Sequence, residues 1–96
     1  MHLVILHLTP AGDAPDRPVE ASMFITAIRA RAGPGEAPEH ISTRIAPPGL
    51  HVGFFYRTES EAMAREYAER LALRVVQELP AFAGWLVDGR ESGAFP

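Results

Sequence analysis

Residues 39–79 most constrain the fold, because two alternating segments are followed there by one long amphipathic segment. Apolar side chains alternate with other types over 40–45 and again over 50–57, which is the period of half-buried strands. In the second segment, one face carries Leu50, Val52, Phe54 and Tyr56. These side chains are predicted to lie in the core, and Ile41 and Ile45 to share the buried face of the first strand.

A tight turn is predicted between these two strands. Pro48 and Gly49 suit the central positions of a type II turn, where proline presets a negative φ and glycine accepts a positive one. The two strands are therefore expected to be antiparallel neighbours.

An amphipathic helix is predicted over residues 59–79. Thr58 and Glu61 have the spacing of a capping box, and Pro80 ends the helix. Its apolar stripe contains Tyr67, Ala68, Leu71, Ala72, Val75, Val76 and Leu79. Pairs of opposite charge four residues apart are expected on its outer surface: Glu61 with Arg65, Glu66 with Arg70, and Arg74 with Glu78.

Three further elements complete the prediction. The nearly continuous apolar run His2–Leu8 indicates a central strand, and residues 84–89 indicate a brief strand bounded by glycines. Residues 18–32 are predicted to be a helix capped by Asp16, although residues 23–25 also fit a strand. The buried stripe of this helix would contain Phe24, Ala27, Ile28 and Ala32.

This order of elements, βαββαβ, is that of ferredoxin-like α+β domains. It predicts a four-stranded antiparallel sheet with two helices on one face and the first and third strands in the centre. One domain is expected over residues 1–96, with a core over 1–89 and a frayed tail over 90–96.

Composition excludes several kinds of chemistry. The chain contains no cysteine, lysine or asparagine, so disulfides, zinc–thiolate sites, thiol nucleophiles and Schiff-base lysines are ruled out. A net charge of −3 argues against nucleic acid as a partner. No apolar run approaches the roughly 20 residues that cross a membrane, and Met1-His2-Leu3 lacks the basic region of a signal peptide. We therefore expect a cytoplasmic protein without a membrane partner. Its high content of alanine, glycine and proline resembles that of proteins from high-GC bacteria.

The sheet face opposite the core is the predicted functional surface. It gathers His7, His40, Ser42, Arg44, His51, Phe55 and Arg57. His7 and His51 are predicted to form a general acid/base pair, because imidazole titrates near neutral pH. The other five are predicted to bind ligand, and Arg44 and Arg57 can clamp a carboxylate or phosphate. Ordinary hydrogen-bonded histidines and solvated arginines are the alternative interpretation.

No metal and no cofactor are expected on this face. His7, His40 and His51 could in principle share a metal ion, but they lack helical His-x-x-x-His spacing, and no obvious carboxylate accompanies them. The aromatic strand Val52–Tyr56 resembles that of RNA-recognition motifs, yet its residue order and the net charge disfavour this function.

The predicted arrangement resembles small dimeric α/β-barrel proteins, in which two ferredoxin-like sheets face each other and enclose a ligand cavity. That group includes cofactor-independent monooxygenases and polyketide-modifying proteins. The resemblance implies a homodimer formed through the open sheet face and a small organic ligand between the sheets, with catalysis left open. The alternative is an adaptor or regulatory subunit without catalytic activity, which would contact a protein through the open sheet, Leu73 or an overhanging helix end.

Overall fold

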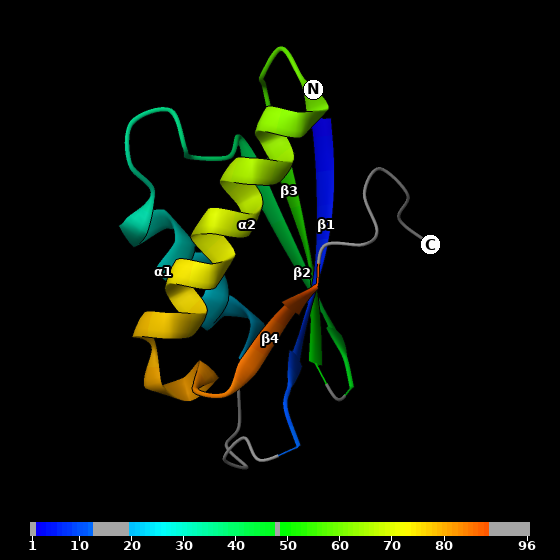
Figure 1. Cartoon of the computed structure of the whole chain (residues 1–96), viewed down its shortest axis with the longest axis vertical. Coiled ribbons are helices and arrows are strands. Elements are labelled where there is room, and N and C mark those ends of the chain that lie inside the picture. Colours follow the sequence, from blue (N-terminus) through cyan, green and yellow to red (C-terminus); the bar gives the residue numbers. More distant parts are fainter. Residues whose placement is uncertain (1, 13–19, 48, 89–96) are drawn as a thin grey trace.

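The computed structural model describes residues 2–12, 20–47 and 49–88. Its elements in chain order are β1 (His2–Pro10), α1 (Ala21–Arg31), β2 (His40–Ala46), β3 (Gly49–Tyr56), α2 (Glu61–Glu78), the 3-10 turn η1 (Pro80–Phe82) and β4 (Trp85–Asp88). The strands form one open antiparallel sheet in the order β2-β3-β1-β4. Figure 1 shows α1 and α2 on the same side of this sheet. The chain is therefore an α+β structure in which the described helices cover one sheet face.

The core fills the space between the helices and the sheet. The predicted buried face of β3 is confirmed, since Leu50, Val52, Phe54 and Tyr56 are each at most 2% exposed. The same layer contains Val4, Leu6 and Leu8 of β1, Phe24, Ala27 and Ile28 of α1, and Ala68, Leu71, Ala72 and Val75 of α2. Burying one large side chain of this kind stabilises the fold by roughly 1.5–3 kcal/mol. Packing in this layer therefore holds α1 and α2 on the sheet.

Ile45 departs from the predicted burial. Ile41 is 4% exposed, whereas Ile45, four residues further along the same face of β2, is 54% exposed. β2 is the edge strand beside β3. Alternation identifies the side of the sheet on which a residue lies, but it does not show how far the helices extend over an edge strand.

The segment preceding β2 is a helix rather than a strand, as predicted, but α1 begins later than expected. Glu20 is its N-cap and makes no side-chain capping hydrogen bond. The predicted cap Asp16 and first-turn Pro18 lie outside the described residues. Ala32, expected in the buried stripe, is the C-cap and packs against the core while remaining partly exposed.

The predicted capping box of α2 is wrong. Ser60 caps the helix, and its Oγ accepts a hydrogen bond from the Met63 N–H at 3.1 Å. Thr58 instead donates from Oγ1 to the Ser60 carbonyl at 2.8 Å. Glu61 is therefore the first helical residue, two positions before the one, Met63, that would close a box with Ser60. The predicted end is confirmed, because α2 stops directly before Leu79 and Pro80.

The observed helix also removes the predicted overhang. At 1.5 Å per residue the 18 residues of α2 extend about 27 Å, and the eight residues of β3 extend about 26 Å. Helix and strand are therefore nearly equal in length. In the part of the chain that the structure describes, no helix is long and apolar enough to cross a membrane.

The predicted type II turn contains Pro48, which lies outside the described residues, and Gly49 is the first residue of β3, paired with Ala46. A Cβ at Gly49 would clash with the backbone carbonyl of Leu8 on β1. Glycine is required here for the close approach of two strands. Positive φ occurs at Gly35 and at Gly84, where the chain turns into β4.

Candidate functional site

A row of four polar side chains crosses the sheet on the face away from the helices. Residues paired in an antiparallel sheet point to the same side. His7 of β1 pairs with His51 of β3 and with Asp88 of β4, and His51 pairs with Arg44 of β2. The polar row is therefore Arg44, His51, His7 and Asp88. With about 4.8 Å between strands, it extends across about 14 Å of the sheet.

The two imidazoles at the centre of the polar row are in contact. Their ring centroids lie 4.0 Å apart, with an interplanar angle of 37°. Arg44 Nη2 lies 3.3 Å from His51 Nδ1. A guanidinium can only donate, so Nδ1 is the acceptor and the proton of neutral His51 resides on Nε2. The contact with Arg44 thus favours one tautomer of His51, the one protonated at Nε2.

Apolar and small residues adjoin the polar row on the same face. The next row along the strands is Ser42, Gly53 and Ile5, and the one after it is His40, Phe55 and Leu3. Gly53 has no side chain, and the rings of His40 and Phe55 lie 5.5 Å apart. Ile5 and Gly53 are buried, so the accessible apolar surface in these two rows lies at Phe55 and Leu3, which are partly exposed.

The structure brings some of the predicted site residues together and separates others. His7, His51 and Arg44 are contiguous, and Ser42 lies in the adjacent row. Arg57 follows the end of β3, where its Nε lies 3.8 Å from Glu39 Oε1. It is thus six residues, or about 20 Å of strand, from His51.

His40 and Phe55 lie at the far end of the predicted set. Phe55, the β3 partner of His40, is four residues from His51, which corresponds to about 13 Å. The three histidines considered for a shared metal site therefore do not converge. Among the described residues, no group of three or more histidine, aspartate or glutamate side chains is arranged to hold a metal ion.

Asp88 is the member of the polar row that the sequence interpretation missed. The statement that no carboxylate accompanies the histidines is wrong, since Asp88 pairs directly with His7. Alternation in β4 places Leu86 and Asp88 on one face, so a signal was present. The register of β4 against β1 was needed to bring Asp88 beside His7.

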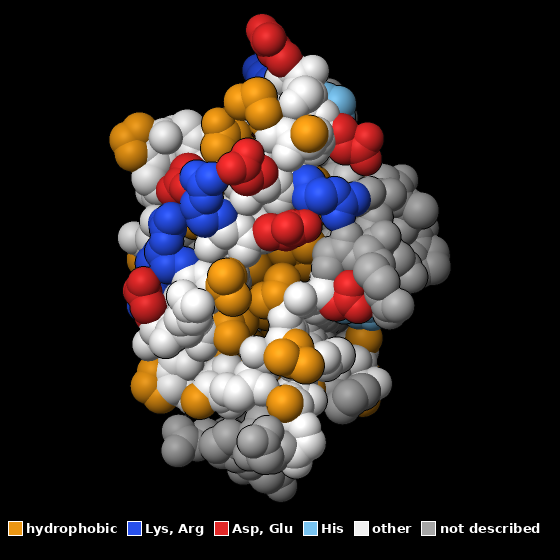
Figure 2. All heavy atoms as spheres, viewed as in Figure 1, with side chains coloured by type: hydrophobic (Ala, Val, Ile, Leu, Met, Phe, Trp, Pro, Cys, Tyr) orange, Lys and Arg blue, Asp and Glu red, His pale blue; other side chains and the backbone are white. Residues whose placement is uncertain are grey.

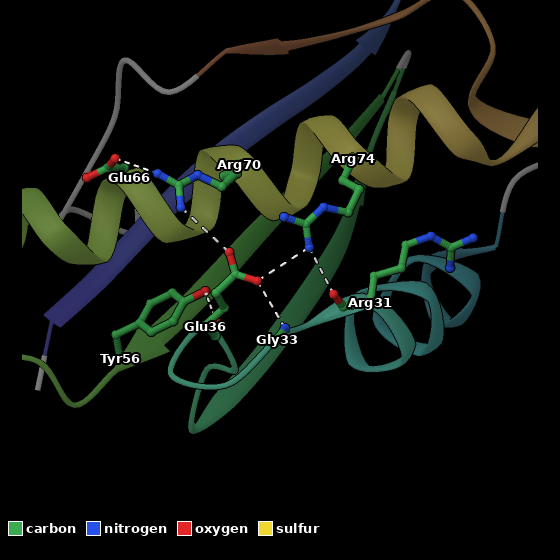
Figure 3. A network of polar contacts seen from close by, with 7 residues as sticks. All are labelled: Arg31, Gly33, Glu36, Tyr56, Glu66, Arg70 and Arg74. Atoms are coloured by element: carbon green, nitrogen blue, oxygen red, sulfur yellow. Dashed lines mark hydrogen bonds and ion pairs between the residues drawn. The ribbon is translucent and has the colours of Figure 1, made fainter.

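A second polar cluster lies on the helix side of the sheet and is centred on Glu36 (Figure 3). Glu36 Oε1 accepts hydrogen bonds from the Gly33 N–H at 3.0 Å and from Arg74 Nη1 at 3.3 Å. Arg70 Nη1 lies 3.8 Å from Oε2. The Gly33 N–H, followed by Arg74, lowers the pKa of the Glu36 carboxyl. The carboxylate therefore joins the segment before β2 to α2.

Other contacts extend this Glu36 network. Tyr56 donates its hydroxyl proton to the Glu36 carbonyl at 2.8 Å, and burial raises the Tyr56 pKa. Arg74 Nη1 also donates to the Arg31 carbonyl at 2.9 Å, and Arg31 Nε donates to Glu78 at 2.9 Å. The predicted pair Arg74–Glu78 is thus wrong, because each has a partner on another segment.

The predicted helical pair Glu66–Arg70 is confirmed at 2.6 Å. Figure 2 shows arginines and acidic side chains interleaved across this side of the molecule, with hydrophobic side chains gathered between the charged groups. Charge on this face is therefore locally balanced and shows no arginine surface of the kind that attracts polyanions.

Comparison with known proteins provides no template for either cluster. No protein-family model, curated protein or solved structure matches the chain. The chemistry of the polar row is therefore the basis for assigning a function. A guanidinium beside two imidazoles can bind an anion and transfer protons.

Proposed function

We propose that this chain is a ferredoxin-like domain that binds a small organic carboxylate on its open sheet face. The polar row carries this proposal. Arg44 is exposed and uses Nη2 toward His51, while a guanidinium has five N–H donors in all. A guanidinium suits a carboxylate, which arginine binds in a bidentate geometry. The Nε2–H of His51 is a further donor for the same ligand.

The surroundings of the polar row favour a ligand with an aromatic or other planar part. Gly53, two residues from His51 on the same face, is buried. Phe55, two residues further, is partly exposed and can contact the edge or face of a ring.

We further propose that a second copy of the chain covers this site. Leu86 lies on the open face beside the polar row and is 59% exposed. An exposed apolar side chain next to a polar cluster is typical of surfaces that are covered in the functional state. Two sheets facing each other would enclose the ligand, and His7 or His51 would then transfer a proton away from bulk water.

The competing proposal is a protein-binding adaptor. Leu73 is half exposed on the outer side of α2, and a shallow groove of about 390 Å³ lies between α1 and Leu79. Both features favour an apolar protein partner. The polar row has no role in this proposal. Variants of the polar row should therefore affect carboxylate binding and leave binding to a protein partner unchanged.

The test is isothermal titration of the purified protein with benzoate, 4-hydroxybenzoate and hexanoate, alongside native mass spectrometry of the subunit number. Arg44→Gln should weaken carboxylate binding by about 10-fold or more, since charge-assisted hydrogen bonds contribute about 1.5–3 kcal/mol. Arg29→Gln, at an exposed arginine of α1 on the helix side, is the matched control and should bind as the wild type does. Equal affinities for Arg44→Gln and Arg29→Gln, or no binding by the wild type, would contradict the proposal.

A further inference from the structure

The two edge strands of the sheet differ in how much unpaired backbone they present. β4 has four residues and pairs with β1 only over His7–Pro10. β2 has seven residues and no proline, and its outer edge pairs with no other strand in the part of the chain that the structure describes. In an antiparallel edge strand, every second N–H and C=O points away from the one neighbour. The outer edge of β2 is therefore long enough for a further strand to pair with it.

The side chains of β2 are nearly symmetric about Thr43. Ile41 and Ile45 lie two residues to either side of it on the face toward the core, and Ser42 and Arg44 flank it on the open face. When a second β2 is placed antiparallel to the first about Thr43, Ile41 of each copy lies opposite Ile45 of the other. Each contact then occurs twice, as a two-fold symmetric interface between identical chains requires.

We propose that a second copy of this chain pairs with the outer edge of β2 and continues the antiparallel sheet across both copies. Ile45 favours this occupant. It is 54% exposed, whereas Ile41 is 4% exposed and belongs to the core. In the proposed pairing, Ile45 lies beside Ile41 of the second copy. The apolar surface that the helices of its own copy leave uncovered is thereby removed from water.

The charge on the open face of β2 opposes this pairing only weakly. Arg44 of one copy would lie opposite Ser42 of the other, and the two Arg44 residues would be diagonal neighbours, about 7–8 Å apart. Arg44 Nη2 lies 3.3 Å from His51 Nδ1 on β3, which is the side of β2 away from its outer edge. The two guanidinium groups are thus directed away from each other.

The edge contact goes beyond the proposed function, in which a second copy covers the open face. Edge and face are separate surfaces, so the pairing of β2 does not depend on the carboxylate site. Pairing along seven residues covers less surface than a permanent dimer usually buries. We therefore expect a reversible dimer that forms at high protein concentration.

A single introduced cysteine tests the geometry directly, because the chain contains no cysteine of its own. Thr43 lies on the proposed two-fold axis, where opposed Cα atoms are about 4.5–5.5 Å apart, within the roughly 4.4–6.8 Å that a disulfide spans. Thr43→Cys should therefore form a covalent dimer under mild oxidation. Leu73→Cys, at an exposed apolar position of α2, is the matched control and should form much less. Equal yields of covalent dimer for the two variants would overturn the proposal.

Sedimentation equilibrium tests the same contact without a crosslink. Ile45→Asp should weaken self-association by at least about tenfold, because a carboxylate would then lie beside Ile41 of the second copy. Leu73→Asp should associate as the wild type does, and circular dichroism checks that both variants are folded. Equal association of the two variants, or a wild type that stays monomeric at about 0.5 mM, would contradict the edge pairing.

Leu86→Asp separates this inference from the proposed function. Leu86 is exposed on the open face, so this substitution should disrupt a face-to-face contact and leave the Thr43→Cys crosslink unchanged. Loss of the crosslink in the double variant would show that β2 does not pair independently, and would overturn the inference. A retained crosslink in a protein that binds no carboxylate would instead contradict the proposed function alone.

Discussion

The Glu36 network and the polar row are both built from arginines and carboxylates, yet they differ in what lies between the charges. In the Glu36 network, arginines contact the carboxylate directly and a backbone N–H completes the contact. In the polar row, two imidazoles separate Arg44 from Asp88. Imidazoles change charge near neutral pH, whereas guanidinium and carboxylate groups do not.

This difference indicates different roles. The Glu36 side chain is 14% exposed and connects the segment before β2 with α2. Its contacts hold two segments together and leave little room for a ligand. The polar row lies on the face that the described helices leave uncovered, and Arg44 in this row is exposed. Stability should therefore depend on the Glu36 network, and binding should depend on the polar row.

The largest expected effect on stability follows from removing the Glu36 carboxylate. Glu36→Ala should lower the free energy of unfolding by about 2 kcal/mol, because the Gly33 N–H and two arginines lose a shared acceptor. Urea unfolding followed by circular dichroism measures this change. Glu66→Ala, which removes an exposed helical pair with Arg70, should cost no more than about 0.5 kcal/mol. Equal losses for both variants would remove the distinction between the clusters.

Tyr56→Phe should have a smaller effect. The Tyr56 hydroxyl donates to the Glu36 carbonyl at 2.8 Å, and the side chain is 1% exposed. Its removal leaves that carbonyl without this donor, which should cost about 1 kcal/mol in the same urea experiment. Carboxylate binding should not change. A loss of binding in Tyr56→Phe would mean that the two clusters are coupled through β3.

The pH dependence of stability gives a further test of Glu36. Its carboxyl pKa is lowered from the ordinary value of 4.5, so the folded chain holds this proton less tightly than the unfolded chain. The resulting stabilisation is present above the unfolded pKa and is lost as pH falls through the folded pKa. Wild-type stability should therefore fall as the pH drops below the ordinary carboxyl pKa of 4.5. Urea midpoints should fall less in Glu36→Gln, and an identical decline would show that other carboxyls dominate.

The smallest stability effect is expected in the polar row itself. Arg44→Gln lies at an exposed edge-strand position and should change the free energy of unfolding by no more than about 0.5 kcal/mol. A larger loss of stability would assign the polar row a structural role.

Arg57→Gln tests how far the binding site extends. An unchanged carboxylate affinity in this variant would restrict the ligand to the polar row. A loss of carboxylate affinity comparable with that of Arg44→Gln would extend the site along β3.

Local sequence was sufficient where a single element contains the signal. Alternation identified the buried face of β3, Pro80 marked the end of α2, and the run between two glycines predicted β4. The adjacency of His7 and His51 followed from the expected central positions of their strands, and the ring contact confirms it. Each of these features depends on periodicity or on backbone chemistry within a few residues.

The predictions failed where two residues were equally suitable for the same role. They also failed where contact with a segment distant in sequence determined the local structure. Thr58 and Ser60 are both good N-cap residues, and the observed geometry selects Ser60. Gly49 is required because Leu8 approaches it, a contact that its own neighbours in sequence do not reveal. Arg74 contacts Glu36 instead of Glu78, since a partly buried carboxylate with a backbone donor was available across the packing interface.

The sequence by itself determined which residues form strands and helices and which side of each element faces the core, because the periods of 2 and 3.6 are properties of the local backbone. Only the tertiary structure decided the strand register, and register determines which side chains meet. Asp88 beside His7, Arg44 beside His51 and the exposure of Ile45 all follow from that pairing and from the extent of helix cover. These are contacts between segments far apart in the chain, whose geometry no local pattern specifies.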